Sequence, residues 1–526
     1  MSGQAIFVTV ILVFLLIALI REVMRPGLVL LSGAVVFMAA GVLTGREMIE
    51  GFSNKGMITV AMLFLVSEGV RQSGVLEELM VKLLPRRKVS VPRVMLRMLP
   101  SISFISAFLN NTPVVVIFAP MLKRWAEKMK VPASKLLIPL SYATILGGMC
   151  TLIGTSTNLV VHGMALDASQ THEGVRGLGM FELGMVGVPV AVIGLLYLTL
   201  VGTRLLPDNR QQTADEGQPA AEGYFRVDVM LGSRFPAIGK KMGEFDFAEK
   251  YGAHILELHR GGERYIVHDM RNMEFHEGDT LLLMADDVFM KNWADSSFFL
   301  MVSDSREDQP QKMGKKLRWF TVALLALMVL GAAIGELPVC KAWAAEHTNG
   351  MAFDMFFFVC IASVIMAWMN IFPTRKYTKF VSWDILIAIA SAFAISKAMQ
   401  NSGMADAVAG LAVGMSRGQS AYFMLALVFI ICNVFTELMT NNAAAALSFP
   451  IALSMAEHLG VSPMPFIVTI CVAASCSFCT PIGYQTNLIV QGVGGYRFGD
   501  FFKVGLPLNL IALVVSVSLV PMIWPF

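Results

Sequence analysis

Charged residues are scarce in this chain, and that scarcity excludes an ordinary soluble protein. Asp, Glu, Lys and Arg make up 15% of the 526 residues, whereas hydrophobic residues make up 56%. A soluble chain of this composition would expose large apolar patches and aggregate. The formal net charge of +3 is too small to predict a nucleic-acid partner. We therefore expect the lipid bilayer to be the solvent for most of the chain.

Cysteine is also sparse, and its positions exclude two kinds of site. None of the seven cysteines lies between residues 207 and 315, in the one long polar stretch of the chain. That stretch therefore has neither a disulfide framework nor a zinc-binding cysteine array. Cys476 and Cys479 have the CxxC spacing, but in an apolar segment they are interpreted as small packing residues.

Apolar stretches long enough to cross a membrane recur along the chain. They lie at residues 5–20, 28–43, 184–206, 318–335, 352–371, 383–398 and 505–524. A membrane-spanning helix needs about 20 such residues. The sequence thus predicts a polytopic α-helical protein of the inner (plasma) membrane.

Basic loops alternate with nearly uncharged loops and predict the orientation. Basic residues gather at 21–25, 86–97, 123–130, 312–318 and 375–379. The positive-inside rule places these loops in the cytoplasm, so both chain termini are expected outside. Residues 94–130 begin and end among basic loops, and we therefore expect a re-entrant helical hairpin there. A second hairpin, at about 418–458, is expected to enter from outside.

Four motifs of the first half of the chain recur in the second half. The matched pairs are Gln72-Ser73-Gly74 with Asn401-Ser402-Gly403, Asn111 with Asn441, Pro120 with Pro450, and IGTSTNLVV (153–161) with IGYQTNLIV (482–490). The offset is 329 or 330 residues in every pair. Because the charge pattern orients the copies oppositely, residues 1–206 and 317–526 are predicted to form an inverted repeat. Such repeats place a central site between the halves, near the bilayer midplane, and work by alternating access.

The residues between the two halves follow a different pattern. Within the insert 207–316, residues 223–293 alternate apolar and polar side chains in short runs separated by Gly, Asp and Glu. Half-buried strands have this pattern. We predict a small cytosolic α+β domain here, joined to the membrane part by polar linkers at 207–222 and 301–316.

Polar residues at the expected helix breaks are the candidate binding residues. The candidate anion-binding residues are Asn110, Asn111 and Thr112 at the first hairpin tip and Thr440, Asn441 and Asn442 at the second. One sodium site is predicted from Asn111, Thr112, Thr155 and Asn158, and its mirror from Asn441, Asn442, Thr486 and Asn487. Half-helix N-termini favour an anion, while amide, hydroxyl and unwound carbonyl oxygens suit sodium. The alternative is that these side chains only cap helix ends or pair across helices.

Ionisable residues in the apolar segments are interpreted differently. The acids Glu68, Asp354, Asp384 and Glu437 do not fall at repeat-equivalent positions, and we expect structural pairing or interfacial placement for them. The lack of a duplicated carboxylate argues against simple proton antiport. His162 follows the first unwound motif, and we interpret it as a helix-packing histidine.

At these motifs the chain resembles the divalent-anion:sodium symporter family of sulfate and dicarboxylate carriers. In that family an SNT triplet marks each hairpin tip. Here the triplets read Asn110-Asn111-Thr112 and Thr440-Asn441-Asn442, with the central Asn kept in both. The Gly-Thr-Pro-Pro-Asn loops of the family resemble GTSTN (154–158) and GYQTN (483–487). Replacement of both prolines in each loop looks more like the sulfate-type or the uncharacterised branch of the family.

The family resemblance implies a function and an assembly. It implies a secondary active symporter, not an enzyme, that moves a small divalent anion with sodium ions. A homodimer and an elevator movement are implied as well. The insert resembles a TrkA-C (RCK C-terminal) domain in the stretches FPAIGKKMGEF, YGAHILELHR and HEGDTLLLMADD. Such domains bind small-ligand effectors or form dimers in the cytosol.

Two other functions are compatible with this organisation. One is an ion channel gated by the TrkA-C-like domain, which is disfavoured because the sequence has no TVGYG-type filter. The other is a nutrient sensor that binds its ligand without transporting it. Flux measurements separate both of them from a symporter.

Overall fold

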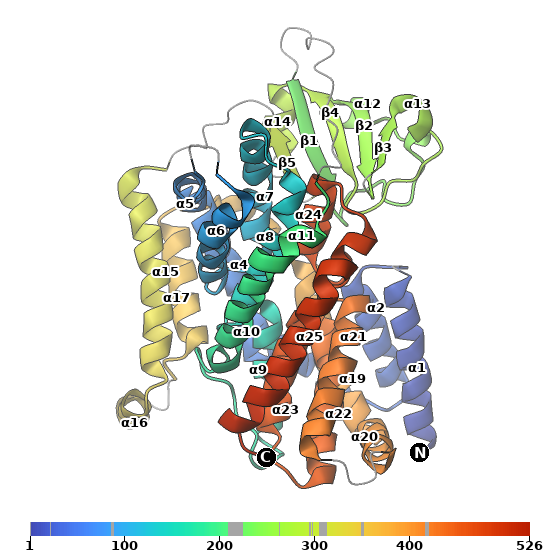
Figure 1. Ribbon diagram of the computed structural model, residues 1–526. Helices are drawn as coiled ribbons and strands as arrows, with labels where there is room; N and C mark the ends of the chain where they lie inside the picture. Colours follow the sequence, from blue (N-terminus) through green and yellow to red (C-terminus); the bar gives the residue numbers. More distant parts are fainter. Residues whose placement is uncertain are drawn as a thin grey trace.

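The computed structural model describes residues 2–21, 23–85, 89–208, 225–261, 263–293, 296, 298–304, 313–348, 352–415 and 420–526. It contains a large helical part and a small sheet domain between residues 225 and 304 (Figure 1). The predicted linkers fall largely outside the described residues. So do Arg86, Arg87 and Lys88 of one predicted cytoplasmic loop.

The helices of the first half precede the sheet domain. They are α1 Gly3–Ile20, α2 Pro26–Ala39, α3 Gly45–Glu50, α4 Lys55–Gln72, α5 Val75–Leu83, α6 Val91–Ser106, α7 Asn111–Lys128, α8 Leu137–Gly148, α9 Ser156–Ala168, α10 Gly184–Tyr197 and α11 Thr203–Leu205. Short 3₁₀ or π segments lie among them at η1 Gly51–Ser53, η2 Ala133–Lys135 and η3 Leu198–Gly202.

The helices of the second half follow the sheet domain. They are α15 Lys315–Gly335, α16 Pro338–His347, α17 Met355–Trp368, α18 Tyr377–Phe380, α19 Trp383–Asn401, α20 Met404–Met415, α21 Ala421–Leu438, α22 Asn441–Leu459, α23 Met464–Ser475, α24 Gln485–Gly494 and α25 Phe498–Ile523. A 3₁₀ turn, η5 Thr374–Lys376, precedes α18.

Most of the predicted apolar stretches form helices suited to a bilayer. Among the described residues, the segments long and apolar enough to cross are Gly3–Ile20, Gly45–Gln72, Gly184–Leu205, Lys315–Gly335, Trp383–Asn401, Ala421–Leu438 and Phe498–Ile523. The predicted stretches 28–43 and 352–371 form the shorter apolar helices α2 and α17. The prediction of a polytopic helical membrane protein is confirmed.

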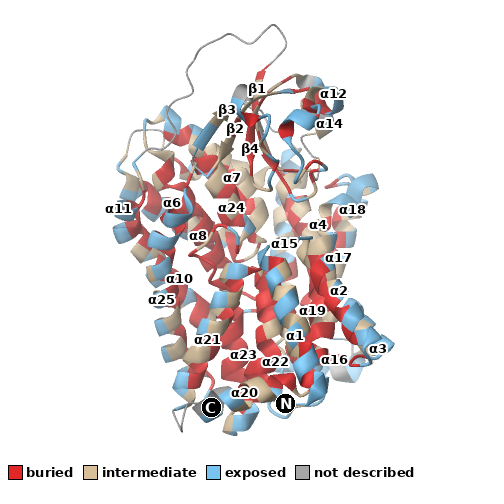
Figure 2. Cartoon of the chain, turned by 90° about the vertical axis from the view of Figure 1, so that its right-hand side faces the viewer, coloured by how far each residue is buried: buried red, intermediate tan, exposed pale blue. Residues whose placement is uncertain are grey.

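Small residues fill the inside of the helical part. Every residue of α8 and α23 is buried, and so is most of α22, including the four alanines 443–446. Small side chains let membrane helices approach closely. By contrast, large apolar side chains of the outer helix α1, such as Phe14, are exposed. Figure 2 colours much of α1 as exposed. An exposed apolar surface of this kind suits contact with lipid.

Matched motifs of the two halves have matched local structure. Gly74 ends α4 and Gly403 ends α19, and each has a φ of +71°, a left-handed conformation that glycine adopts without strain. Pro120 lies inside α7, and Pro450 lies at the same depth inside α22. The glycines that end helices and the prolines inside helices therefore recur with the same offset as the sequence motifs.

The sheet domain has five antiparallel strands in the order β3-β2-β4-β1-β5. The strands are β1 Phe225–Leu231, β2 His254–Arg260, β3 Glu263–Ile266, β4 Thr280–Ala285 and β5 Phe299–Asp304, with η4 Met242–Glu244, α12 Phe247–Tyr251, α13 Val267–Met270 and α14 Asp287–Trp293 between them. The sequence pattern ended the domain at residue 293, but β5 lies beyond that point and pairs with β1. Its apolar run FLMV does not alternate, which is why periodicity did not reveal it.

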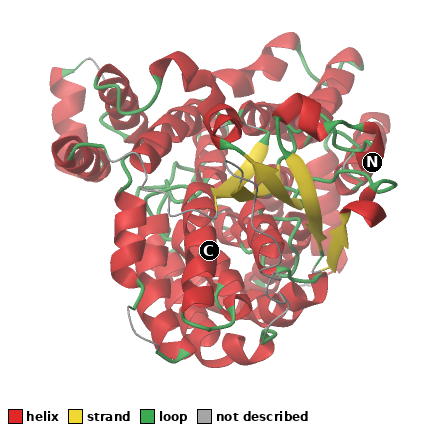
Figure 3. Cartoon of the chain, turned by 90° about the horizontal axis from the view of Figure 1, so that it is seen from above, coloured by secondary structure: helices red, strands yellow, loops and turns green. Residues whose placement is uncertain are grey.

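The sheet domain packs directly on two membrane helices. Gly278 lies against Leu488 of α24, where a Cβ at Gly278 would be 2.7 Å from the Leu488 side chain. A Cβ at Gly492 of α24 would lie 2.4 Å from the Met230 side chain of β1. Lys123 of α7 forms an ion pair of 3.6 Å with Asp228. The strands lie over the helices in the view from above (Figure 3). Both chain termini lie at the opposite end of the helical part (Figure 1).

Candidate functional site

Four helices begin at breaks that carry the predicted polar residues. The residues immediately before α7, α9, α22 and α24 are Asn110, Thr155, Thr440 and Tyr484, and each has an extended backbone or lies close to it. None of these four side chains makes a capping hydrogen bond to its own helix. Capping alone, the first part of the alternative interpretation, therefore does not account for these four residues, whereas pairing across helices, its second part, does occur at the tips. The first-turn N–H groups of all four helices are left without a side-chain cap.

The central asparagine of each tip is held from the preceding helix. Ser106 Oγ donates to Asn111 Oδ1 at 2.7 Å, and Thr436 Oγ1 donates to Asn441 Oδ1 at 2.8 Å. Both asparagines are buried, with 0% and 7% of their surface exposed. In both halves the hydroxyl lies five residues before the asparagine, so the tips have the same internal support.

The two unwound loops also have one hydrogen-bond framework. Asn158 Nδ2 donates to the carbonyls of Gly148 and Thr151 at 3.2 and 2.9 Å. Asn487 Nδ2 donates to the carbonyls of Ser477 and Thr480 at 2.8 and 3.1 Å. In both loops the acceptors lie ten and seven residues before the asparagine.

A glycine makes each loop compact. The amide of Gly154 donates to Thr151 Oγ1 at 3.1 Å, and the amide of Gly483 donates to Thr480 Oγ1 at 3.3 Å. A Cβ at Gly154 would lie 2.6 Å from the Gly148 carbonyl oxygen, so only glycine fits this turn.

Each tip contacts the loop of the other half. Thr112 Oγ1 donates to Gln485 Oε1 at 3.3 Å. In the counterpart contact, Asn442 Oδ1 accepts from Ser156 Oγ at 3.3 Å and from Thr157 Oγ1 at 3.2 Å. The predicted tip residues are therefore joined to the loops crosswise between the halves, through Gln485, Ser156 and Thr157, which were not among the predicted site residues.

Tyr484 joins the two tips, and it was not among the predicted site residues. Asn111 Nδ2 donates to its hydroxyl at 2.5 Å, and Thr155 Oγ1 lies 3.1 Å from the same oxygen. Asn441 also forms a side-chain hydrogen bond with it. Tyr484 is the residue that aligns with Thr155 in the repeat, and this mismatch in an otherwise matched motif was the available signal.

The two predicted sodium sites differ at the asparagine carbonyl. Asn158 is fully buried, and its Oδ1 has no hydrogen-bond partner. Asn487 Oδ1 instead lies 2.7 Å from Ser141 Oγ, which is also 2.9 Å from Thr486 Oγ1. The first site thus presents an unpaired buried oxygen, and the second is already satisfied by a hydroxyl from α8. An unpaired buried acceptor is costly unless something binds it.

Intramembrane acids are paired, as expected from the sequence. Arg71 donates two hydrogen bonds to Glu68. Lys55 pairs with Asp354, which also caps α17. Asp384 accepts from the backbone of Gly27.

Glu437 is the acid closest in sequence to a tip. Its Oε1 accepts from the amides of Phe478 and Cys479 at 2.9 and 2.7 Å and from Asn509 Nδ2 at 3.0 Å. This carboxylate holds the second loop in shape. Among the described residues, no group of three His, Cys, Asp or Glu side chains could hold a metal ion.

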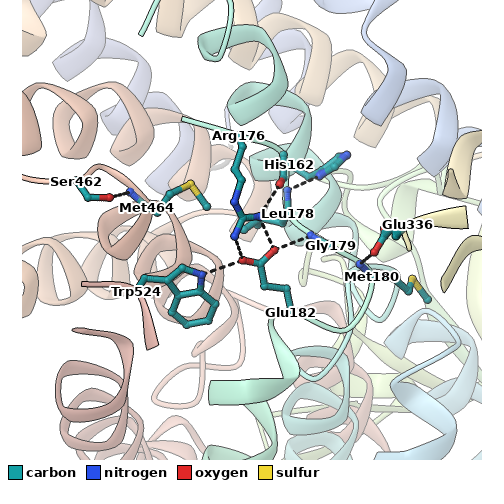
Figure 4. Close-up of polar contacts among 11 residues, drawn as sticks. His162, Arg176, Leu178, Gly179, Met180, Glu182, Glu336, Ser462, Met464 and Trp524 are labelled. Atoms are coloured by element: carbon teal, nitrogen blue, oxygen red, sulfur yellow. Dashed lines mark hydrogen bonds and ion pairs between the residues drawn. The ribbon is translucent and has the colours of Figure 1, made fainter. Parts of the chain in front are cut away.

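A second polar cluster fastens the loop between α9 and α10 to the C-terminus (Figure 4). Glu182 accepts from Arg176 Nη1 and from the amide of Gly179, both at 2.8 Å, and from Trp524 Nε1 at 2.8 Å. Burial alone would raise the pKa of Glu182, but the hydrogen bonds from Arg176, Gly179 and Trp524 outweigh it and hold the pKa below its ordinary value. We call this set the Glu182 clasp.

Glu336 fastens the same loop to the end of α15. Its carboxylate accepts from the amide of Met180 at 2.7 Å, and burial raises its pKa. His162 Nδ1 accepts from the amide of Leu178 at 3.0 Å, which agrees with a packing role (Figure 4). A cavity of about 680 Å³ lies beside this cluster. Its lining includes Lys55, which is paired with Asp354.

Comparisons with known proteins agree with this architecture. The sequence matches the CitMHS family model, described as a citrate transporter, over residues 14–473 and 438–526. An uncharacterized transporter of Synechocystis sp. is 28% identical over 98% of this chain and 96% of its own length. Sodium/sulfate cotransporter 1 of Chlamydomonas reinhardtii is 26% identical over 63% of this chain and 36% of its own length.

Two further matches cover most of the chain. The sodium-dependent dicarboxylate transporter SdcS of Staphylococcus saprophyticus is 20% identical over 100% of this chain and 87% of its own length. The crystal structure of the YdaH transporter of Alcanivorax borkumensis superposes with a TM-score of 0.53 at 13% identity, covering 90% of this chain and 86% of that one. This likeness concerns the fold alone.

Proposed function

This chain belongs to the CitMHS citrate transporter family, and we propose that it is a sodium-coupled symporter for a small divalent anion, either a sulfate-like oxyanion or a dicarboxylate. The family consists of transporters, not enzymes. Relatives of this chain include a sodium/sulfate cotransporter and a sodium-dependent dicarboxylate transporter. We propose that this chain uses the same ion and substrate class as these relatives and binds both at its hairpin tips.

The single observation that carries the proposal is the meeting of four uncapped helix N-termini. The tips of α7 and α22 and the starts of α9 and α24 are linked by the contacts of Thr112, Asn442 and Tyr484. Helix N-termini present N–H groups and the positive end of the helix dipole, which favour an anion. No basic side chain is needed at such a site, and the hydrogen bonds described there are made by neutral groups.

Sodium supplies the positive charge that the side chains lack. The proposed first sodium site uses Asn111, Thr112, Thr155 and Asn158, and the unpaired Oδ1 of Asn158 supports it. The proposed second site uses Asn441, Asn442, Thr486 and Asn487. Amide, hydroxyl and carbonyl oxygens are ligands for a hard cation. Bound sodium would order the tips and offset the repulsion that a dianion meets in the membrane.

Alternating access is proposed from the repeat. Residues 1–206 and 317–526 would form inverted halves, with re-entrant hairpins at 94–130 and 418–458. The matched glycines, prolines and hydrogen-bond frameworks of the two halves support this relation. Both termini lie opposite the sheet domain, which agrees with external termini and a cytosolic domain (Figure 1). A homodimer moving as an elevator is proposed from the family resemblance.

The sheet domain is proposed to be a TrkA-C-like regulatory module that binds a small effector. Its contact with α24 supports this role, because Leu488 lies beside the proposed site residue Asn487. A change in the domain would therefore reach the site through a single helical turn.

The test is uptake by the purified full-length protein in sealed proteoliposomes. Labelled sulfate and labelled succinate are supplied with an inward sodium gradient, or with choline in its place. We expect accumulation only with sodium, and its loss in Asn111→Ala and in Asn441→Ala. The control is Asn401→Ala, because Asn401 contacts Val42 and Glu47 away from the tips.

Each other outcome has a definite meaning. Intact uptake in both tip variants would reject the site, and uptake without sodium would reject the coupling. Sodium-dependent binding without any flux would indicate a sensor. Currents far above carrier turnover would indicate a channel.

A further inference from the structure

One oxygen atom lies at the centre of the candidate site, and it belongs to the protein. The hydroxyl of Tyr484 is 2.5 Å from Asn111 Nδ2 and 3.1 Å from Thr155 Oγ1, and it is hydrogen-bonded to Asn441 as well. The two tips are therefore bridged through a single phenol oxygen. Two of its partners, Asn111 and Asn441, are also candidate anion-binding residues.

The position of Tyr484 breaks the pseudo-symmetry of the site. The repeat offset of 329 residues aligns Tyr484 with Thr155 and Gln485 with Ser156. The loop of the second half thus carries two long side chains where the loop of the first half carries two short ones. A threonine at 484 would offer a hydroxyl but leave the volume of an aromatic ring open between the tips.

The position of Tyr484 between the second loop and the first tip favours one of the two proposed substrate classes. A sulfate-like oxyanion carries all its oxygens around one atom, so donors converging on one point can bind it. A dicarboxylate or citrate carries its charged groups on separate carbons and needs anchors that are further apart. The Tyr484 side chain starts from the second loop and its hydroxyl reaches Asn111 at the tip of the first half, so the phenol ring occupies the space between these two elements.

We propose that Tyr484 sets the size limit of the substrate, confining the site to a compact oxyanion of the sulfate class and excluding multi-carbon carboxylates. This inference rests on the proposed function. It assigns the phenol two separable roles. The hydroxyl helps to bind the anion and the tips, and the ring excludes longer molecules.

The experiment measures sodium-dependent uptake of labelled sulfate in proteoliposomes and its competition by unlabelled sulfate, succinate and citrate. For the natural sequence we expect competition by sulfate alone. Tyr484→Thr, which installs the residue of the first half, should gain competition by succinate, with at least a tenfold lower inhibitory concentration. Tyr484→Phe keeps the ring, so it should still exclude succinate while its KM for sulfate rises by about tenfold, the loss of one hydrogen bond to a charged group.

A matched control is Tyr496→Phe, since Tyr496 is another buried tyrosine of the second half whose hydroxyl binds the backbone at Ser134 and Ile138. It should leave the ratio of sulfate to succinate competition unchanged. Succinate competing as well as sulfate in the natural sequence would overturn the proposal even if Tyr484→Thr fails to fold. Equal loss of both substrates in both Tyr484 variants would indicate a purely structural bridge and overturn it too. If no anion is taken up with sodium by any form, the proposed function itself fails.

Discussion

The loop around Asn158 and the loop around Asn487 show what duplication has kept and what it has changed. Both asparagines donate to backbone carbonyls ten and seven residues earlier, and both loops close on a glycine amide. The side chains that face the centre differ. Asn158 Oδ1 is unpaired, whereas Asn487 Oδ1 is met by Ser141. The backbone scaffold is shared, and the ligand-facing atoms have diverged.

This difference suggests unequal roles for the two proposed sodium sites. An unpaired buried carbonyl gains a full interaction when a cation arrives, while a carbonyl already bonded to a hydroxyl must give up that bond first. We therefore expect the first site to bind sodium more tightly than the second.

The largest expected effect comes from removing each asparagine in turn. Asn158→Ala and Asn487→Ala each leave two backbone carbonyls of the loop unpaired, at a cost of about 1–3 kcal/mol for each carbonyl that is buried. Both variants should unfold at lower temperature than the natural protein. Asn158→Ala should also lose more of the stabilisation by sodium than Asn487→Ala, measured as the rise in unfolding temperature when sodium chloride replaces choline chloride. Equal loss of the sodium effect in both variants would remove the distinction between the sites.

A smaller effect is expected at Ser141, which could make the two sites alike. Ser141→Ala removes the hydroxyl that satisfies Asn487 Oδ1, and it should cost about 1 kcal/mol in the absence of sodium. Sodium should restore part of that stability, because the second carbonyl then resembles that of Asn158. Thermal unfolding over a series of sodium concentrations checks this, with Ser169→Ala as the control because Ser169 is an exposed hydroxyl beyond α9. A sodium dependence identical to that of the natural protein would contradict it.

The smallest effect concerns pH and lies outside both sites, at the Glu182 clasp. The pKa of Glu182 is held below its ordinary value near 4.5, so its contribution to stability is present above pH 4.5 and is lost as the pH falls through the lowered pKa. The advantage of the natural protein over Glu182→Gln should therefore shrink as the pH falls from 7 to 4. The pKa of Glu336 is raised, so its contribution is present below pH 4.5 and is lost as the pH rises through the raised pKa.

The two acids are therefore expected to change the pH dependence of stability in opposite directions. Glu336→Gln should become more stable relative to the natural protein as the pH rises above 4.5. Unfolding temperatures of both variants across this range check the pair, and each shift should stay below about 1 kcal/mol because both carboxylates keep polar partners. Parallel pH trends in the two variants would show that the assigned partners are wrong.

Much of the helical part was predictable because its signals are local. The apolar stretches at 5–20 and 505–524 became α1 and α25, and the tip residues Asn111 and Asn441 became the first residues of helices. The length and hydropathy of the apolar stretches predict the two helices. The polar residues at each helix break predict where the helices of the tips begin. The end of the sheet domain was not predictable in the same way, since β5 reads as a plain apolar run and is defined by its pairing with β1.

Some residues around the tips could be predicted from the sequence, and others could not. Asn158 and Asn487 were predicted from the repeat, but Ser141 looks like one more small residue in an apolar helix. Tyr484 was visible only as a mismatch in a motif. Nothing within either half reveals that Asn111 donates to a tyrosine 373 positions away.

By itself the sequence determined the helices, their interruptions and the correspondence between the halves, because these follow from composition, hydropathy and residues a few positions apart. The tertiary structure alone decided which tip meets which loop, that one tyrosine oxygen joins them, and that one asparagine carbonyl is satisfied while its counterpart is not. These depend on how helices far apart in the chain pack together, and a hydrogen bond forms only when that packing brings donor and acceptor within about 3 Å.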